Sequence, residues 1–224
     1  MKALEGIGLY FAYGKKPLFL NVNISISEGE CVALTGPSGS GKSTLCHILS
    51  GVIPRSFEGN VSGTVRLFGN DIRSLSLEET VKRVGIVFQN PDSQLFSPTV
   101  EDEVAFGPEN LCLEREEIGR RITASLDSVG MQKYRYASPA KLSGGQKQLI
   151  ALASVLALEP KALIFDEALS QLDEDSAALV KHAIREQKAR GKAILMAEHD
   201  PNNLDIADRV YAFSDGSLSE VTHA

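Results

Sequence analysis

The sequence predicts an α/β fold with a mainly parallel sheet, a small antiparallel sheet near the N-terminus and an inserted helical segment. Three observations indicate this fold: a glycine-rich loop between a strand-like and a helix-like run, several nearly continuous apolar runs, and an alternating N-terminal segment. The 224 residues fit one domain, 1–224, that is long enough to bury a normal core.

Several runs are nearly continuous in hydrophobic residues, which is typical of strands covered on both faces. They are 84–88, 162–165, 193–197 and 210–213. We therefore assign 1–90 and 159–224 to the α/β core. Asp215-Gly216 lies between two strand-like runs and predicts a hairpin turn.

The segment 21–27 alternates polar and apolar residues, which is the period of a strand with one wet face. The segment 64–68 repeats this pattern more weakly, and 9–13 is rich in aromatic residues. Together they predict a small antiparallel β subdomain beside the main sheet.

The segment 91–158 carries mostly helical signals and predicts a helical subdomain inserted into the core. Its clearest apolar stripe recurs at helical spacing and ends before Gly130. The stripe consists of Ile118, Ile122, Leu126 and Val129.

Net charge, cysteine spacing and apolar run length narrow the range of possible functions. The net charge of −6 and the lack of a Lys/Arg-dense tract argue against a nucleic-acid partner. Cys31, Cys46 and Cys112 show no paired spacing, so we interpret them as reduced core residues of a cytosolic protein. No signal peptide is evident, and the longest apolar run, 149–158, is too short to cross a bilayer. If membranes matter, another chain supplies the spans.

The glycine-rich loop predicts a polyphosphate site. It follows the apolar run 30–35 and opens a helix predicted over 42–50. Its glycines let backbone N–H groups turn inward, while Lys42 adds a point charge and Ser43 a hydroxyl for Mg²⁺. The helix N-terminus adds partial positive charge. The loop residues are Gly36, Pro37, Ser38, Gly39, Ser40, Gly41, Lys42, Ser43 and Thr44.

Two adjacent carboxylates, Asp166 and Glu167, end the strand predicted at 162–165. Ligands of α/β sheets lie outside the carboxyl ends of the strands. In P-loop NTPases an aspartate at this place holds Mg²⁺, and a following glutamate can polarise the attacking water. The alternative is an acidic pair that merely ends the strand and caps the next segment.

Residues 142–148 read Leu-Ser-Gly-Gly-Gln-Lys-Gln and open an apolar helix. Ser143 can serve as N-cap, and Gly144 and Gly145 expose N–H groups at a positive helix end. This pattern suits either an anion site or an ordinary helix N-terminus.

Taken together, these motifs resemble the nucleotide-binding subunits of ABC transporters in order and approximate spacing over nearly the whole chain. The matching residues are Gly36 to Thr44, Gln89, Leu142 to Gln146, Phe165 to Glu167, Leu172-Asp173 and His199. The resemblance implies a P-loop NTPase (RecA-like) core, with ATP and Mg²⁺ as ligands.

The resemblance also implies individual roles. Lys42, Ser43 and Thr44 would hold phosphates and Mg²⁺, together with Asp166. Gln89 would sense the metal and the γ-phosphate.

Glu167 would be the catalytic base, and His199 would contact the γ-phosphate. Tyr13 matches the aromatic residue that stacks on adenine in the family. A core role for Tyr13 is equally open, since Tyr10 and Phe11 are close by.

In the resembling family, the element at 142–146 covers ATP held by a partner subunit. This implies a head-to-tail dimer, homo- or heteromeric, that closes around two ATP molecules. The residues that would act across the interface are Ser143, Gly144, Gly145, Gln146 and Asp173.

The segment 88–110 is similar to the energy-coupling-factor branch of the family, whose ATPases drive uptake of vitamins or of cobalt and nickel ions. Residues 153–156 fit the same branch. The segment 88–110 has four apolar residues of interest, Leu95, Phe96, Val100 and Phe106. Some of them are expected to be exposed and to receive a helix of an integral membrane subunit. The alternative is that all four are buried.

Two departures from the family pattern stand out. The stretch 168–173 reads Ala-Leu-Ser-Gln-Leu-Asp, where relatives usually carry Pro, Thr and Gly at the first, second and fourth positions. Leu149 stands where most relatives carry arginine. Neither departure touches the predicted phosphate, metal or base residues, so we expect hydrolysis to survive. A chain that pairs with a non-identical partner is one interpretation of these departures, and the homodimer stays open.

The sequence thus predicts an ATPase that converts ATP to ADP and phosphate and powers an energy-coupling-factor importer, bound peripherally at the cytoplasmic face of the membrane. One alternative is a soluble ABC-type ATPase without a membrane partner. Another is a regulatory module that holds ATP and hydrolyses it poorly.

Overall fold

The alternating N-terminal segment forms the predicted antiparallel sheet. The computed structural model describes residues 1–14, 16–56, 59–170 and 172–221. Four strands lie in the order β2-β1-β4-β5. They are β1 (Lys2–Tyr13), β2 (Lys16–Ser27), β4 (Asn60–Leu67) and β5 (Asn70–Asp71).

The continuous apolar runs form a second sheet, in the order β10-β9-β3-β8-β7-β6. Its pairs from β9 to β6 are parallel, and β10 joins antiparallel through the predicted hairpin turn at Asp215-Gly216. The strands are β3 (Cys31–Thr35), β6 (Val84–Val87), β7 (Ala162–Asp166), β8 (Ala193–Ala197), β9 (Arg209–Ser214) and β10 (Ser217–Val221).

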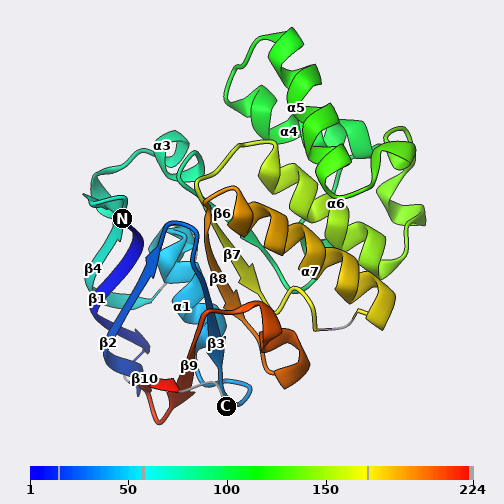
Figure 1. The fold of residues 1–224 in the computed structure, drawn as a ribbon. Helices are drawn as coiled ribbons and strands as arrows, with labels where there is room; N and C mark the ends of the chain where they lie inside the picture. Colours follow the sequence, from blue (N-terminus) through cyan, green and yellow to red (C-terminus); the bar gives the residue numbers. More distant parts are fainter. Residues whose placement is uncertain (15, 57–58, 171, 222–224) are drawn as a thin grey trace.

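Helices fill the chain between the strands. The α-helices are α1 (Lys42–Leu49), α2 (Val52–Arg55), α3 (Leu77–Val81), α4 (Val100–Asn110), α5 (Arg115–Ser128), α6 (Gly144–Leu156) and α7 (Glu174–Ala189). The 3₁₀ helices are η1 (Ile72–Ser74), η2 (Pro91–Ser93), η3 (Gln132–Tyr134), η4 (Pro139–Lys141) and η5 (Pro201–Ile206). Figure 1 shows α4 and α5 projecting away from the sheets, with α6 and α7 beside the parallel sheet.

Both faces of the parallel sheet are buried, which explains the continuous apolar runs. Along β8, Ile194 and Met196 belong to a core shared with α6 and α7, whereas Leu195 and Ala197 belong to a core shared with α1 and the antiparallel sheet. Successive side chains point to opposite faces, so one short strand serves two cores. The predicted fold class is confirmed.

The cysteine prediction holds for two of the three residues. Cys31 and Cys46 are buried, whereas Cys112 is exposed. Cys112 lies in the turn after α4 with a φ of 52°. Connections run over the surface, so the prediction that Cys112 is a core residue is wrong.

Candidate nucleotide-binding and catalytic site

The phosphate loop joins β3 to α1 through glycines that the packing requires. Gly36 has a φ of 139°, and a Cβ there would lie 2.6 Å from the carbonyl oxygen of Phe213. Gly41, with a φ of 112°, is the N-cap of α1, and no side chain caps the helix. The first N–H groups of α1 are therefore available to an anion.

Lys42 is held inside this loop. Its side chain is only 3% exposed, and Nζ donates hydrogen bonds to the carbonyl oxygens of Gly36 at 2.9 Å and Pro37 at 3.1 Å. Nζ also lies 3.5 Å from Oε1 of Glu167. The Lys42 ammonium group thus contacts both the loop and the Glu167 carboxylate at the carboxyl edge of the sheet.

Glu167 is the meeting point of the predicted catalytic residues. Gln89 donates from Nε2 to its Oε2 at 3.2 Å, and Nδ1 of His199 lies 3.9 Å from the same oxygen. Its backbone has a φ of 50°, an uncommon conformation for a residue other than glycine. Glu167 N donates to Ala197 O at 3.0 Å, which extends the pairing of β7 with β8 and fixes this geometry.

Lys42, Glu167 and His199 line one cleft of about 560 Å³, a volume within the usual range of small-molecule sites. The structure therefore brings together the loop, Glu167 and His199 as the sequence predicted. The lining residues are Thr35, Gly36, Pro37, Ser38, Lys42, Glu167 and His199.

The surroundings of Asp166 fit a divalent cation. The side chain is 5% exposed, and its buried Oδ1 has no hydrogen-bond partner among the described residues. Oδ2 lies 3.3 Å from Nε2 of His47. The described residues contain no group of three or more His, Cys, Asp or Glu that could hold an ion by themselves. Mg²⁺ would therefore depend on Ser43, Gln89 and nucleotide phosphates, in keeping with its preference for few protein ligands.

Tyr13 is an exposed aromatic residue beside the loop. Its side chain is 58% exposed, its hydroxyl lies 3.4 Å from Oγ1 of Thr44, and its ring packs edge-on against buried Phe11. A hollow lies next to it, lined by Tyr13, Gly14, Pro54, Gly59 and Asn60. The exposure excludes a core role for Tyr13.

The second glycine-rich element begins α6 with a capping box. Ser143 Oγ accepts from Gln146 N, and Gln146 Oε1 accepts from Ser143 N. A Cβ on Gly145 would lie 2.1 Å from Oγ of Ser176, in the first turn of α7, where Asp173 is the N-cap. None of residues 142–146 lines the cleft around Lys42, as far as the described chain shows.

Two buried residues that sequence reasoning missed support this site. Gln148 is 1% exposed and donates from Nε2 to Phe88 O at 3.0 Å, which ties α6 to the backbone just before Gln89. Glu198 is fully buried beside His199, and burial raises its pKa to about 7. A carboxylate directly after an apolar strand was the available signal for Glu198.

The unusual stretch after Glu167 is packed into the protein. Ala168 and Leu169 are buried in the core shared with α6 and α7, and so is Leu149. Ser170 Oγ accepts from Gln89 Nε2 at 3.4 Å. Gln171 lies outside the described residues. These apolar replacements therefore fill space inside the subunit.

The predicted docking residues divide into exposed and buried ones. Phe96 is 66% exposed, Phe106 is 47% exposed, and their rings pack edge-on with centroids 4.7 Å apart. Leu95 is partly buried, and Val100 is fully buried in the core. Val100 is one of the core-facing residues of α4, so it is not an exposed member of the set. The alternative that all four residues are buried is wrong.

The sequence matches the family described as ABC transporter over residues 19–170. A putative ABC transporter ATP-binding protein of Methanosarcina acetivorans is 46% identical over 214 residues, which cover 94% of this chain and 33% of the relative. The energy-coupling factor transporter ATP-binding protein EcfA of the same organism is 42% identical over 219 residues, 97% of this chain and 78% of EcfA. This chain spans about a third of the length of two of the matched relatives.

The structure of cbiO1 from Clostridium perfringens, described as part of the ABC transporter complex cbiONQ, has a TM-score of 0.85 and 32% identity. The match covers 97% of this chain and 87% of that one. No helix of the described residues combines the length and hydropathy needed to cross a membrane. The fold, the clustered motifs and these relatives agree: the chain belongs to the ABC transporter family, as one of its ATP-binding ATPase domains.

Proposed function

We propose that this chain is the ATP-hydrolysing subunit of an energy-coupling-factor importer, bound peripherally at the cytoplasmic face of the membrane. The gathering of Lys42, Gln89 and His199 around the Glu167 carboxylate carries the proposal. The similarity to EcfA and cbiO1 supports the importer branch. The transported substrate would be a vitamin or a cobalt or nickel ion.

Nucleotide binding would redirect Lys42. Its Nζ is now held by two neutral carbonyl oxygens and by Glu167. Phosphate oxygens of ATP make stronger, charge-assisted hydrogen bonds than carbonyl oxygens do. The uncapped N–H groups of α1 would bind the same phosphates, and the exposed ring of Tyr13 would stack on adenine.

Glu167 would act as general base and accept the proton of the attacking water. Because Gln89 donates to one of its oxygens, the carboxylate is already oriented. His199 would donate to the γ-phosphate, where negative charge is held during transfer. Bound Mg²⁺, held by Ser43, Gln89 and Asp166, would neutralise charge on the phosphates.

The chain would complete its site with a second ATPase subunit. Ser143 and Asp173 are exposed N-caps of α6 and α7, whose first turns touch at Gly145 and Ser176. These helix ends form one polar surface outside the chain's own cleft. We infer that Ser143, Gly144, Gly145 and Gln146, with Asp173, cover the nucleotide of the partner in a head-to-tail dimer.

Copurification tests the importer assignment. The tagged chain, extracted from its native membranes in mild detergent, should retain an integral membrane protein together with any second ATPase. Glu167→Gln serves as a matched bait, because it removes the base but not the docking surface. Recovery of both baits without any integral membrane protein would contradict the importer proposal and favour an ATPase without a membrane partner.

A further inference from the structure

A second cavity, of about 520 Å³, opens at the opposite edge of the parallel sheet from Glu167. Lys161 directly precedes β7 and Lys192 directly precedes β8, whereas Glu167 and Glu198 directly follow these strands. A strand of this length spans roughly 16 Å. The two cavities are therefore separate sites at the two ends of the same strands.

The wall of this far-edge pocket has an excess of positive charge. Its ionisable residues are Arg121, Lys161, Arg190, Lys192, Glu28 and Glu159. Glu159 is bound by Arg121 at 2.9 Å, and Glu28 lies 3.9 Å from the N-terminal amine. Lys161 and Lys192 form no ion pair with any described residue. This excess is local, since the whole chain has a net charge of −6.

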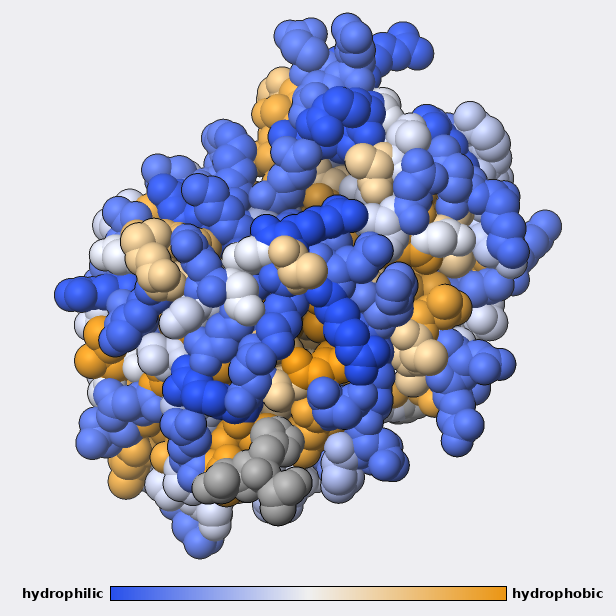
Figure 2. Space-filling view, in the orientation of Figure 1, coloured by the Kyte–Doolittle hydropathy of each residue, from blue (hydrophilic) through white to orange (hydrophobic). Residues whose placement is uncertain are grey.

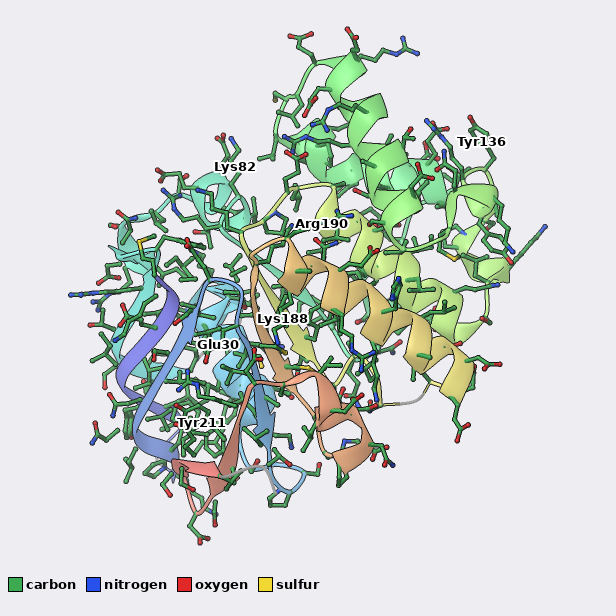
Figure 3. The ribbon with its side chains drawn as sticks, viewed as in Figure 1. Glu30, Lys82, Tyr136, Lys188, Arg190 and Tyr211 are labelled. Atoms are coloured by element: carbon green, nitrogen blue, oxygen red, sulfur yellow. The ribbon has the colours of Figure 1, made fainter. Side chains whose placement is uncertain are left out.

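Lys192 shows most clearly that a counter-charge is missing. Burial, and after it the nearby Arg190, lower its pKa to about 8, against an ordinary value of 10.5, and the opposing effect of Glu159 is smaller than either. Figure 3 labels Arg190 where α7 ends, beside the helical insertion. An anion in the pocket would remove this destabilisation of the charged amine.

Two more wall residues offer unused donors. Lys161 Nζ lies over the Phe68 ring, 5.7 Å from its centroid, and has no carboxylate partner among the described residues. Gln187 is 1% exposed, and its Nε2 finds no acceptor within the described chain. Buried donors of this kind are normally satisfied, which favours a bound acceptor.

We propose that this far-edge pocket binds a phosphate group, held chiefly by Lys161 and Lys192. A phosphate dianion matches two unpaired ammonium groups, and lysine is a compact point charge suited to it. The source is free phosphate or a small phosphate ester, whose apolar part would contact Phe68 and Pro160 in the same wall. Because Arg121 of α5 also lines the pocket, the ligand would touch both the core and the helical insertion.

Titration of the full chain with inorganic phosphate tests this proposal, with backbone amide NMR shifts as the readout. Saturating ADP is present throughout, so that the Lys42 cleft is already occupied. Saturable shifts are expected around Lys161 and Lys192. Lys192→Met and Lys161→Met should each weaken binding by roughly tenfold or more, the loss of one charge-assisted contact. Lys82→Met is the control, because Lys82 is an exposed lysine of the α3 region paired with Glu78.

Further ligands separate the sources. If phenyl phosphate binds more tightly than inorganic phosphate, the natural ligand is a phosphate ester. If the two bind with equal affinity, the natural ligand is free phosphate. Both results support the proposal. It is overturned if phosphate causes no saturable shifts there, if acetate binds as well as phosphate, or if the Lys192→Met and Lys161→Met proteins, folded by their spectra, bind phosphate like the Lys82→Met protein.

Discussion

Glu198 holds the backbone of Leu169: its Oε1 accepts a hydrogen bond from Leu169 N at 3.3 Å. Its Oε2 accepts from Nδ2 of Asn203 at 3.4 Å, and its own N–H donates to Leu34 O at 2.9 Å. The buried carboxyl group thus connects the segment that follows Glu167 with the one that carries His199. The departure from the family pattern at Leu169 lies against this carboxyl group.

The first prediction concerns pH. The pKa of Glu198 rises from 4.5 to about 7 on folding, chiefly through burial. The folded state therefore binds more protons between these values, and this carboxyl lowers stability as pH rises from about 4.5 to 7. At 1.36 kcal/mol per pH unit, the loss is at most about 3 kcal/mol.

Urea unfolding at pH 5 and pH 8 measures this loss. Glu198→Gln should gain stability relative to the unmodified chain at pH 8 and should gain little at pH 5. Glu116→Gln, an exposed carboxylate of α5, is the matched control. A Glu198→Gln difference that is equal at both pH values would rule out the buried acid as the cause.

The second prediction concerns the base. Glu167→Gln should lower ATP turnover by about 10²-fold or more, because the amide cannot accept the proton of the attacking water. ATP binding should persist, since the variant leaves Lys42 and the uncapped N–H groups of α1 in place for the phosphates. Steady-state turnover and equilibrium binding of the same preparation measure both. Wild-type turnover in this variant would exclude Glu167 as the base.

The third prediction separates two neighbouring glycines. A Cβ on Gly145 would meet Ser176 at 2.1 Å, whereas a Cβ on Gly144 would meet nothing within 4 Å. Gly145→Ala should therefore destabilise the fold by roughly 1–3 kcal/mol through overpacking. Gly144→Ala should keep its stability and instead lower turnover by about tenfold or more, because the added methyl would face the partner's ATP in the proposed dimer.

Thermal unfolding and ATP turnover of both glycine variants provide the measurement. Gly145→Ala with Ser176→Gly should recover stability, since the clashing side chain is removed. Unchanged turnover in Gly144→Ala would argue against its place at the dimer interface.

The fourth prediction concerns the exposed pair of rings. Phe96→Ser with Phe106→Ser should leave the stability and ATPase activity of the isolated chain unchanged within a factor of about two, because both side chains face solvent. Recovery of the membrane subunit in pull-downs should be lost. Val100→Ala should do the opposite, lowering stability by roughly 1–3 kcal/mol with docking intact. Full recovery of the membrane subunit by the double variant would place docking elsewhere.

The exposed pair of rings has to be compared with the rest of the protein surface. Figure 2 shows a face that is mostly hydrophilic, with apolar areas that are small and separate. Single exposed apolar residues are normal on such a surface. The contact between Phe96 and Phe106 distinguishes this pair from single exposed residues and is the reason we propose it for docking.

Much of the fold could be predicted because its signals are local. The apolar run 193–197 predicted β8, and the glycine-rich loop before Lys42 predicted the start of α1. Both signals depend only on neighbouring residues. Exposure was harder to predict. Val100 and Phe96 are both apolar and only four positions apart, yet one is buried and the other faces solvent.

The sequence alone determined which chemical groups this protein has and in what order: the glycine-rich loop, the carboxylates Asp166 and Glu167, and His199. Only the tertiary structure decided that Gln89 donates to Glu167 across 78 positions, and that Lys161 and Lys192 share a pocket at the far edge. The reason is physical. Residue type and spacing fix local geometry, whereas contacts between distant residues depend on how strands pair and helices pack.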